Sequence, residues 1–461
     1  MTSRREFLKS CAVGVSGATL GGLAYATQSI GSTSGIAART TTAAADGRPP
    51  QIESAIRRDE TILRLGGSGD GLTMTWAADD RQFVALQDGI GWGSNWLERI
   101  PSQGSNYNSR LLAITGGPRD ATFEDVPGYP DLPNIRNTED EQRYYGFGTL
   151  ALNGRIYQFL STLDHPVAAK RPCSRWVGAK LIYSPDNGRT WHNQDGSTPV
   201  VWESWQRRSR DNMAFFEEPQ DAFSLLTFLQ MGRSYECNQD GYVYVYAPNG
   251  NTDGTMNELV MFRVPKARIL ERRAYQYFAG LTRDGGARWV SNIDARGIVH
   301  TFPRGWVNRM LPGALVVESW LPSITYNKPL GLYLMASCGV GCAANGELFG
   351  KPSYLGFWVA HTPWGPWRQI FEETAWAPAG DENARALDVQ IAPKWISADG
   401  KSFWLVWTDF GKPSNPDEGP EPEIEDAWSA NLEEHKRLLE RSREQHPGYA
   451  FTMQRVDFIV K

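Results

Sequence analysis

The feature that most constrains this sequence is a β-hairpin pattern that recurs five times along the chain. In each case two short segments rich in apolar, aromatic and β-branched residues are separated by turn residues, as in the pair joined by Asn153-Gly154. Asn-Gly between two such segments is the strongest short-range signal for a hairpin. The five predicted hairpins span residues 72–87, 148–161, 224–247, 323–337 and 392–408.

Five units of this kind predict an all-β chain folded as a five-bladed β-propeller over residues 61–461. Radial repetition of small sheets is one way in which an all-β protein limits its exposed sheet edges. We expect the N-terminal strand Thr61–Leu65 to close the last blade beside the C-terminal strand Thr452–Val460. The alternative is a pair of β-sandwiches built from similar hairpins.

Two turn motifs favour the propeller. Residues 184–191, SPDNGRTW, match the Ser-x-Asp-x-Gly-x-Thr-Trp pattern of the Asp box, which occurs in sialidase-like and other propellers. Residues 282–289, TRDGGARW, are a degenerate second copy. Asp and Gly shape such a turn. We interpret Asp186 and Asp284 as markers of the fold between the outer strands of a blade, rather than as catalytic groups.

The first 26 residues have the pattern of a twin-arginine (Tat) export signal. Arg4 and Arg5 precede a weakly apolar stretch, residues 11–23, and a small-residue cleavage site follows at Ala24-Tyr25-Ala26. Residues 27–60 are predicted to be a flexible linker, because their first part is rich in Ser, Thr, Ala and Gly. We therefore expect a periplasmic or extracellular protein.

Composition excludes several classes of protein. The net charge is −5, from 47 Lys and Arg against 52 Asp and Glu, whereas nucleic-acid binding needs a clustered basic face. With 41% apolar and 12% aromatic residues, the chain can bury a large core and is not disordered. No apolar run long enough to span a membrane follows the signal. We expect a monomer.

No cofactor and no metal site are expected, since the six His form no His-Glu-x-x-His motif and no Cys-x-x-Cys pair occurs. Residues 249–254, NGNTDG, resemble the start of a calcium loop, but Val260 stands where that loop needs an acid. A structural calcium therefore stays an open alternative to an ordinary turn. In an exported protein, three disulfide pairings are open to Cys173, Cys237, Cys338 and Cys342.

Residues 411–447 interrupt the hairpin pattern. Four prolines stand among acidic residues at the start of this segment, and a helix is predicted from Ile424 to Gln445, with Trp428, Leu432 and Leu439 on one face. We predict an acidic, helical insertion docked on the last blade, with a lid over the functional site as the alternative.

Two aspartates of the first hairpin are the strongest candidates for catalysis. Asp70 precedes the first strand and Asp88 follows the second. Because the two strands are antiparallel, both carboxylates emerge at the same open end, about 5–9 Å apart. Paired carboxyl groups at such separations hydrolyse glycosidic bonds: one protonates the leaving oxygen, while the other activates water or attacks the anomeric carbon. Ordinary loop carboxylates are the alternative.

Further acids and aromatic residues are predicted near the same end. The acids are Asp164 after the second hairpin, Glu318 before the fourth, and Asp388 and Asp409 around the fifth. We expect Asp164, Glu318 and Asp388 to contact the substrate, with ordinary loop carboxylates as the alternative. Converging acids raise one another's pKa, which keeps a carboxylic acid protonated near neutral pH. Candidates for stacking on sugar rings, or alternatively for core packing, are Trp76, Trp92 and Tyr326.

The first-blade segment 67–92, which runs from GSGDGLTMTWAADD to LQDGIGW, resembles a family of secreted bacterial five-bladed propellers of largely unknown function (DUF4185-type). That family is related to endo-D-arabinanases. Agreement continues at 241–246 (GYVYVY) and 362–367 (TPWGPW). The resemblance implies that Asp70 and Asp88 match the two first-blade aspartates proposed as the catalytic pair of the arabinanases. It also implies that Arg233 matches a basic residue of the third blade and contacts the substrate.

Together these observations predict an exported glycoside hydrolase that acts on a polysaccharide or oligosaccharide, with an arabinan-like glycan implied by the resemblance. One alternative is a non-catalytic carbohydrate-binding propeller, which would tolerate loss of Asp70 or Asp88. Another is a protein-interaction propeller that uses residues 411–447 as its contact surface. A sialidase is disfavoured, because no trio of Arg at strand starts is evident.

Overall fold

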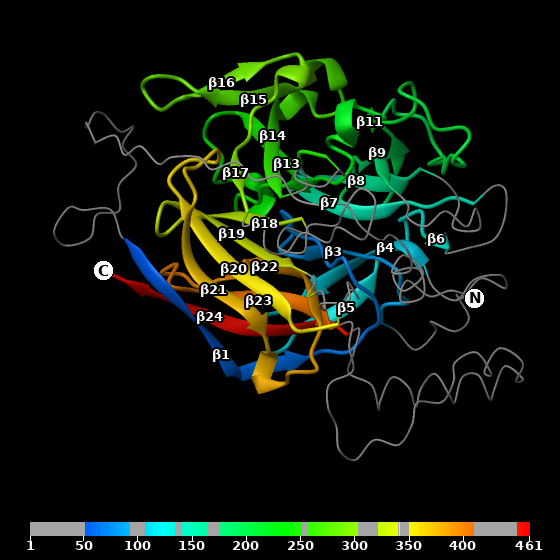
Figure 1. Cartoon of the computed structure of the whole chain (residues 1–461). Coiled ribbons are helices and arrows are strands. Elements are labelled where there is room, and N and C mark those ends of the chain that lie inside the picture. Colours follow the sequence, from blue (N-terminus) through cyan, green and yellow to red (C-terminus); the bar gives the residue numbers. More distant parts are fainter. Residues whose placement is uncertain are drawn as a thin grey trace, which may run out of the picture.

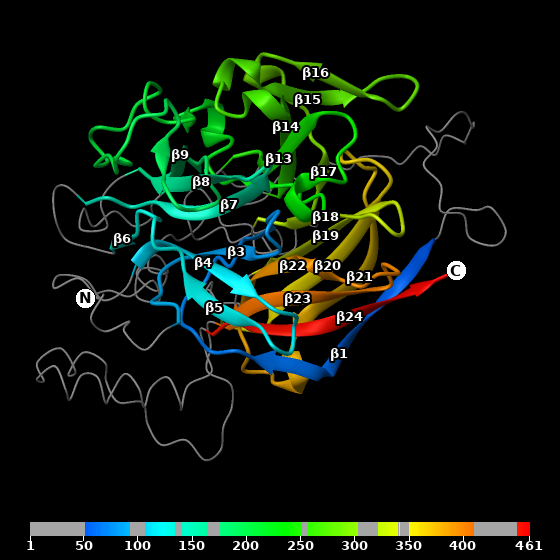
Figure 2. The ribbon, with the colours of Figure 1, turned by 180° about the vertical axis from the view of Figure 1, so that it is seen from behind.

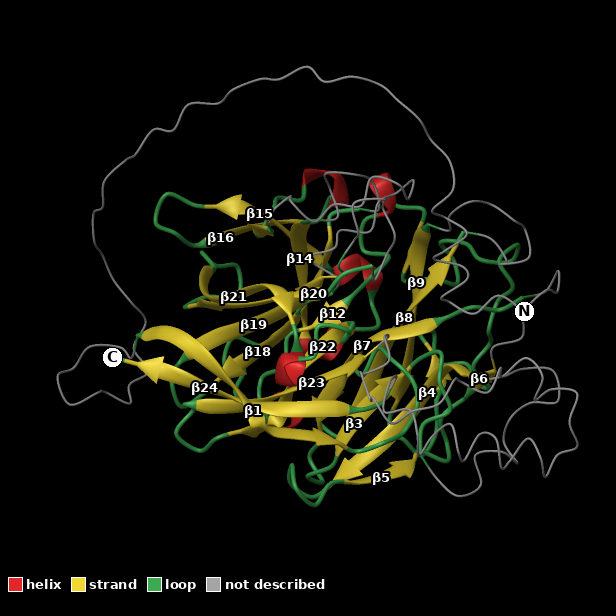
Figure 3. Cartoon of the chain, turned by 60° about the horizontal axis from the view of Figure 1, so that its bottom comes forward, coloured by secondary structure: helices red, strands yellow, loops and turns green. Residues whose placement is uncertain are grey.

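The computed structural model of the chain describes residues 51–92, 107–133, 141–164, 175–250, 257–302, 321–339, 341, 350–409 and 450–461. The predicted signal 1–26, the insertion 411–447 and Glu318 lie outside these residues. The described residues form five antiparallel sheets, as predicted for a five-bladed propeller. Strands dominate, and the described helices are short 3-10 turns (Figure 3).

The sheets follow one another along the chain as five blades. Blade 1 contains β2 (Met74–Trp76), β3 (Gln82–Leu86), β4 (Tyr107–Thr115) and β5 (Thr122–Asp125), with β6 (Leu132–Pro133) beside β4. Blade 2 contains β7 (Tyr145–Leu152), β8 (Arg155–Leu163), β9 (Trp176–Ser184) and β10 (His192–Asn193), with β11 (Phe215–Phe216) beside β9. Blade 3 contains β12 (Thr227–Phe228), β13 (Tyr242–Pro248), β14 (Glu258–Pro265), β15 (Gln276–Leu281) and β16 (Ala287–Val290), with β17 (His300–Thr301) beside β14.

Blade 4 contains β18 (Ser323–Asn327), β19 (Leu332–Gly339), β20 (Ser353–Ala360) and β21 (Arg368–Trp376). Blade 5 contains β22 (Ala386–Ile396), β23 (Ser402–Asp409), β24 (Thr452–Val460) and β1 (Ile52–Arg64). The described 3-10 turns are η2 (Pro219–Asp221), η3 (Arg233–Tyr235), η4 (Lys266–Arg268), η5 (Arg272–Ala274), η6 (Ile293–Ala295) and η8 (Pro378–Gly380).

The two ends of the described chain complete the same blade. Strand β1 pairs antiparallel with β24, so that Ile52 lies opposite Val460 and Leu63 opposite Met453. Figures 1 and 2 show the two strands side by side, in blue and red. The predicted closure is therefore confirmed. The closing strand is longer than Thr61–Leu65, because it begins at Ile52, within the segment assigned to the linker.

The first strand of each blade lies on the inside, and these five strands form a closed ring. Strand β2 contacts β7 and β22, β7 also contacts β12, β12 contacts β18, and β18 contacts β22. Hydrogen bonds that involve polar side chains join neighbouring inner strands or the residues just before them, for example from Thr73 Oγ1 to Gly146 O (3.1 Å) and from Ile391 N to Ser323 Oγ (3.0 Å). Buried polar groups on the inner strands thus find partners across the blade boundaries.

The core lies between the blades. Strand β3 shows why: Phe83 and Ala85 pack in the cluster shared with blade 2, whereas Val84 and Leu86 pack in the cluster shared with blade 5. Successive strand residues point to opposite faces, and both faces of this sheet are covered. That is why β3 is apolar almost throughout, without the polar alternation of a half-exposed strand.

Both Asp-box segments connect outer strands, as predicted. The first joins β9 to β10, where Asp186 Oδ1 accepts from the N–H groups of Thr190 (2.8 Å) and Arg189 (3.1 Å). Trp191 is buried and meets Tyr129 edge to face at 5.0 Å. The second segment joins β15 to β16 and is exposed.

Two of the cysteines after the signal are described, and both are free thiols. Cys237 is partly buried and Cys338 is buried. Burial raises the pKa of the Cys338 thiol to about 12. Their partners in the possible pairings, Cys173 and Cys342, lie outside the described residues, and the structure shows no bridge at Cys338. Among the described residues no helix is long and apolar enough to cross a membrane.

Candidate functional site

Every inner strand starts at the same end of the propeller, so the start of each first strand and the end of each second strand meet there. We call this end, which holds Asp70, Asp88 and Asp388, the acidic end. The β2–β3 and β7–β8 connections lie at the opposite end, which we call the turn end. Residues in the loops between strands therefore lie either at the acidic end or at the turn end.

Asp70 and Asp88 lie on neighbouring backbone segments at the acidic end. Asp70 forms a bridge with Gln87, with N···O distances of 2.9 Å in both directions, and Asp88 is the next residue. Both residues are buried, at 0% and 5% exposure, and Asn108 Nδ2 donates to Asp88 Oδ1 at 3.3 Å. The first-hairpin geometry predicted from the sequence therefore holds for the backbone of this pair.

Asp388 approaches the same segment from blade 5. Its Oδ2 accepts a hydrogen bond from Gly71 N at 3.1 Å, and the residue is 3% exposed. Gly71 directly follows Asp70. The structure therefore brings Asp70, Asp88 and Asp388 together, although they come from the first and the last blade.

Four non-glycine residues at the acidic end have a strained backbone. Leu72, Asp88, Leu321 and Asp388 have positive φ angles of 35°, 43°, 48° and 55°. Non-glycine residues rarely adopt this region, and Leu does so least readily of these types. Such conformations persist only where the surrounding structure enforces them, and they cluster at functional sites.

A buried arginine lies beside the pair. Arg143 precedes β7; its Nη1 is 3.2 Å from Glu141 Oε1 and its Nη2 donates to Tyr145 Oη. Burial alone would lower the pKa of Arg143, but Tyr145, whose hydroxyl accepts from the guanidinium, and the carboxylates of Asp88 and Glu141 outweigh it and raise that pKa. The guanidinium thus stays charged within electrostatic range of Asp88.

The other half of the acidic end is apolar. Tyr145, Phe147, Leu163, Leu225 and Leu321 form a buried cluster at the starts or ends of strands in blades 2, 3 and 4. Trp176, which begins β9, packs edge to face on Tyr145 (5.2 Å) and Phe147 (5.4 Å) and is partly exposed. Carboxylates from blades 1 and 5 thus share this end with aromatic and aliphatic side chains from blades 2 to 4.

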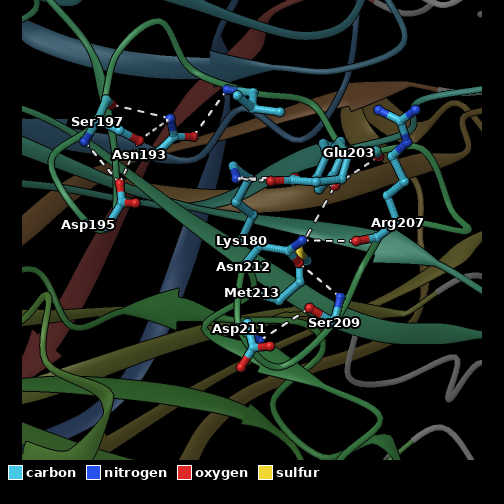
Figure 4. Close-up of polar contacts among 12 residues, drawn as sticks. Lys180, Asn193, Asp195, Ser197, Glu203, Arg207, Ser209, Asp211, Asn212 and Met213 are labelled. Carbon is cyan, nitrogen blue, oxygen red and sulfur yellow. Dashed lines mark hydrogen bonds and ion pairs between the residues drawn. The ribbon is translucent and has the colours of Figure 1, made fainter.

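Blade 2 also holds a buried ion pair. Lys180 Nζ lies 2.8 Å from Glu203 Oε1, and Figure 4 shows the two side chains meeting between β9 and the segment that follows β10. Tyr144 Oη donates to Glu203 Oε2 at 2.9 Å, and the Arg208 guanidinium lies 5.5 Å from the Tyr144 ring. Tyr144 lies between Arg143 and Tyr145 in the sequence. The buried group of Lys180, Glu203 and Tyr144 is therefore connected through the backbone to the residues beside Asp88.

Two further predicted residues have partners of their own. Asp164 Oδ1 accepts from Arg175 N at 3.3 Å. Trp92 stacks on Phe123 at 3.8 Å, and its Nε1 donates to Leu65 O at 2.8 Å. Trp92 thus packs between blade 1 and the closing strand.

The structure does not bring Trp76, Arg233 and Tyr326 together with Asp70. Trp76 ends β2 and donates from Nε1 to Asp80 Oδ1 at 3.0 Å, in the β2–β3 turn. Arg233 donates from Nε to Ala78 O in the same turn at 2.9 Å. Tyr326 is the penultimate residue of β18 and contacts Tyr333 at 4.9 Å. All three lie at the turn end.

Asp409 closes β23 and is 1% exposed. Burial raises the pKa of its carboxyl to about 6, although the N–H of Trp407 and the charge of Arg64 oppose the increase. Trp407 Nε1 donates to Asp409 Oδ2 at 3.3 Å. Trp407 in turn packs against Trp376 of blade 4. The indole group that donates to Asp409 therefore lies between blades 4 and 5.

Sequence reasoning missed Glu141, Arg143 and Trp176. The second hairpin was predicted to begin at Gly148, but β7 begins at Tyr145, so the two charged residues lie much closer to the strand than expected. The available signal was the Arg143-Tyr144-Tyr145 segment just before a predicted inner strand. Within the described part of the chain, no group of three or more His, Cys, Asp or Glu side chains is arranged to hold a metal ion.

Comparisons with known proteins give a family match and several similar solved structures. Residues 148–316 match a family model described as a domain of unknown function (DUF4185), which confirms the resemblance predicted from the motifs. No curated protein matches the sequence. Solved structures that resemble the fold include a proposed hydrolase from Bacteroides ovatus, at 14% identity and a TM-score of 0.42, with 85% of this chain and 87% of that chain covered.

Two further solved structures are similar over most of their length. The native arabinanase of Bacillus subtilis matches at 10% identity and a TM-score of 0.38, with 85% of this chain and 94% of that chain covered. An α-L-arabinofuranosidase from Podospora anserina, in complex with cellotriose, matches at 11% identity and a TM-score of 0.36, with 88% and 96% covered. At these identities and TM-scores, activity has to be argued from the residues of this chain.

Proposed function

We propose that this protein is an exported glycoside hydrolase that cleaves a polysaccharide with the carboxyl groups of Asp70 and Asp88. The observation that carries the proposal is the bridge between Asp70 and Gln87, which fixes two buried aspartates side by side at the open end of a β-propeller. Two acids at one end of a propeller are the groups that the two-carboxylate mechanism of glycoside hydrolysis needs.

The backbone geometry suits the two-carboxylate mechanism. Residues paired across antiparallel strands have Cα atoms about 5.5 Å apart, and Asp88 is one residue beyond Gln87. Paired acids hydrolyse glycosides when their carboxyl groups lie about 5–9.5 Å apart, and we propose that Asp70 and Asp88 act at such a separation. One group protonates the leaving oxygen, while the other activates water or attacks the anomeric carbon.

The surroundings favour different roles for the two acids. Asp88 lies within range of the Arg143 guanidinium and accepts from Asn108, which suits a base or nucleophile that acts as an anion. Asp70 directly precedes Gly71, whose N–H donates to Asp388 Oδ2, so its backbone is held at this end. We therefore assign Asp70 as the general acid and Asp88 as the base or nucleophile.

The apolar half of the acidic end suits a sugar chain. The C–H faces of a sugar ring pack on aromatic side chains, and Trp176 is a partly exposed aromatic residue at this end. The motifs of the first blade support an arabinan-like substrate. Arg4 and Arg5, with the apolar stretch that follows them, support export by the Tat route.

The test is digestion of a panel of polysaccharides that includes arabinogalactan. Wild type is compared with Asp70→Asn and Asp88→Asn, and with Asp284→Asn as a matched control in an exposed turn. We expect products from wild type and the control, and a loss of at least about 1,000-fold in each site variant at unchanged thermal stability. Product sizes separate endo from exo cleavage.

The opposite outcome is equally specific. Binding of a glycan without product release, unchanged in Asp70→Asn and Asp88→Asn, would show a carbohydrate-binding propeller. Product release that survives in both variants would move catalysis away from this pair.

A further inference from the structure

The peptide group between Asp70 and Gly71 is held from both sides. Its carbonyl oxygen, on Asp70, accepts from Gln87 N at 2.9 Å. Its N–H, on Gly71, donates to Asp388 Oδ2 at 3.1 Å. The N–H of Asp70 donates to Gln87 O at 2.9 Å. The backbone on both sides of the Asp70 Cα is thus fixed, which sets the direction in which the Asp70 side chain leaves it.

These hydrogen bonds come from two different blades. Gln87 follows β3 in blade 1, whereas Asp388 belongs to β22 in blade 5. The pairing of β22 with β23 shifts register between Leu387 and Gln390, and Asp388 itself has φ 55°. Irregularities of this kind re-aim a side chain out of the regular pleat. Here the irregularity directs a buried carboxylate across the blade boundary.

Gly71 makes the close approach feasible. It has φ +82°, a conformation that L-residues rarely adopt, and a Cβ at this position would lie 2.4 Å from Gln87 Nε2. The Gln87 side chain therefore packs directly over Gly71 on one side. The Gly71 N–H points to Asp388.

We propose that Asp388 is a positioning residue of the proposed hydrolase, which aligns Asp70 through the N–H of Gly71 without contacting the reacting atoms. This inference rests on the proposed function, since it takes Asp70 as a catalytic acid. Asp388 Oδ2 lies no more than about 6 Å from the Asp70 Cα, given the 3.1 Å hydrogen bond and the intervening bond lengths. A misplacement of about 1 Å at a catalytic group can cost about 100-fold in rate.

The chain offers a matched control for a purely structural role. Ser323 Oγ accepts from Ile391 N at 3.0 Å, so it also joins two inner strands by a buried hydrogen bond from a side chain to the backbone. That bond links blades 4 and 5 and does not involve the Asp70 segment. Ser323→Ala removes a comparable cross-blade contact and leaves the Asp70–Gly71 peptide group held.

The experiment compares Asp388→Asn, Asp388→Gly and Ser323→Ala with wild type. Asn tolerates positive φ and keeps an oxygen that accepts from Gly71 N, whereas Gly tolerates the conformation and has no acceptor. We expect kcat to stay within about threefold of wild type for Asp388→Asn and Ser323→Ala. For Asp388→Gly we expect kcat to fall about 30- to 100-fold, with KM within about threefold.

Hydrogen exchange gives a readout that does not depend on activity. The amide of Gly71 should exchange faster in Asp388→Gly, but not in Asp388→Asn or Ser323→Ala. Unchanged kcat in Asp388→Gly, or a loss confined to KM, overturns the positioning role, and the KM result would indicate the substrate contact predicted from the sequence. If wild type cleaves glycan but Asp70→Asn does so equally well, the assignment of Asp70 fails instead. A wild type that cleaves nothing overturns both.

Discussion

The ammonium group of Lys180 and the carboxylate of Glu203 form a buried ion pair in blade 2, with Nζ 2.8 Å from Oε1 and 3.1 Å from Oε2. Both side chains are almost fully enclosed, and Tyr144 donates to the same carboxylate. Removal of one partner from such a pair leaves an uncompensated charge in the protein interior.

We expect Lys180→Met to lower the free energy of unfolding by about 3–5 kcal/mol, because Glu203 then lacks its cation. The double variant Lys180→Met/Glu203→Gln should recover much of that loss. Urea unfolding at pH 7 measures both. The surface pair Lys461–Glu53, with an N···O distance of 2.7 Å, is the control, and Lys461→Met should cost less than about 1 kcal/mol. Equal losses for Lys180→Met and Lys461→Met would contradict the prediction.

Asp409 should make stability depend on pH. In the folded protein burial raises the pKa of Asp409 to about 6, whereas in the unfolded chain an Asp ionises near pH 3.9. The contribution of Asp409 to stability therefore falls as pH rises from about 4 to 6, and it stays low at higher pH. Asp409→Asn keeps an acceptor for Trp407 and should be more stable than wild type at pH 7 by about 1–3 kcal/mol, but not at pH 3.

Chemical unfolding of wild type and Asp409→Asn at pH 3, 5 and 7 measures the difference in their free energies of unfolding, which should grow as pH rises. The exposed residue Asp211 supplies the control substitution, Asp211→Asn, which should leave the pH dependence unchanged. A variant that is less stable than wild type at pH 7 would show that the ionised form of Asp409 is favoured by the fold.

Arg143 should affect catalysis more than binding. Its guanidinium is held by Glu141 and Tyr145 and couples to Asp88. We expect Arg143→Gln to lower kcat by at least about 10-fold with a smaller change in KM, and Arg143→Lys to recover part of the loss because it keeps the charge. Steady-state kinetics measure both effects, with the polysaccharide that wild type cleaves in the panel described above as substrate. An unchanged kcat in Arg143→Gln would show that Arg143 has no role in catalysis.

The Asp box of blade 2 should contribute stability and no activity. Asp186 accepts four hydrogen bonds, from the N–H groups of Arg189 and Thr190 and from the hydroxyl groups of Thr190 and Ser184. We expect Asp186→Ala to cost about 1–2 kcal/mol in the free energy of unfolding. Asp284→Ala, in the degenerate copy, should cost less, because that turn is exposed. Thermal denaturation compares the two, and a loss of specific activity in folded Asp186→Ala would contradict the structural role.

The part of the site that depends on one hairpin could be predicted from the sequence. Asp70 and Asp88 flank two adjacent antiparallel strands, so their proximity follows from the hairpin alone, and the Asp70–Gln87 bridge agrees with it. The contribution of Asp388 was predicted only as a position at the same end. Its contact with Gly71 depends on a register shift and a positive φ angle in β22, which no local pattern in the sequence indicates.

The aromatic residues show where the sequence was insufficient. Trp76 and Tyr326 are close to candidate acids in the sequence, but they lie at the far ends of β2 and β18. A strand rises about 3.3 Å per residue, so four or five residues carry a side chain to the other end of the propeller. Trp176 starts its strand at the acidic end, and its position became clear only once the bounds of β9 were known.

The closure of blade 5 by β1 and β24 also constrains the order of folding. The first described strand to be synthesised has its hydrogen-bonding partner in the last, as the pairing of Ile52 with Val460 shows. A nascent chain can therefore complete its early blades during translation, but the ring stays open until the C-terminal strand is free to pair. Contacts of such long sequence separation form slowly. Until then β1 is an unpaired strand, and a chain truncated before Thr452 would carry that exposed edge permanently.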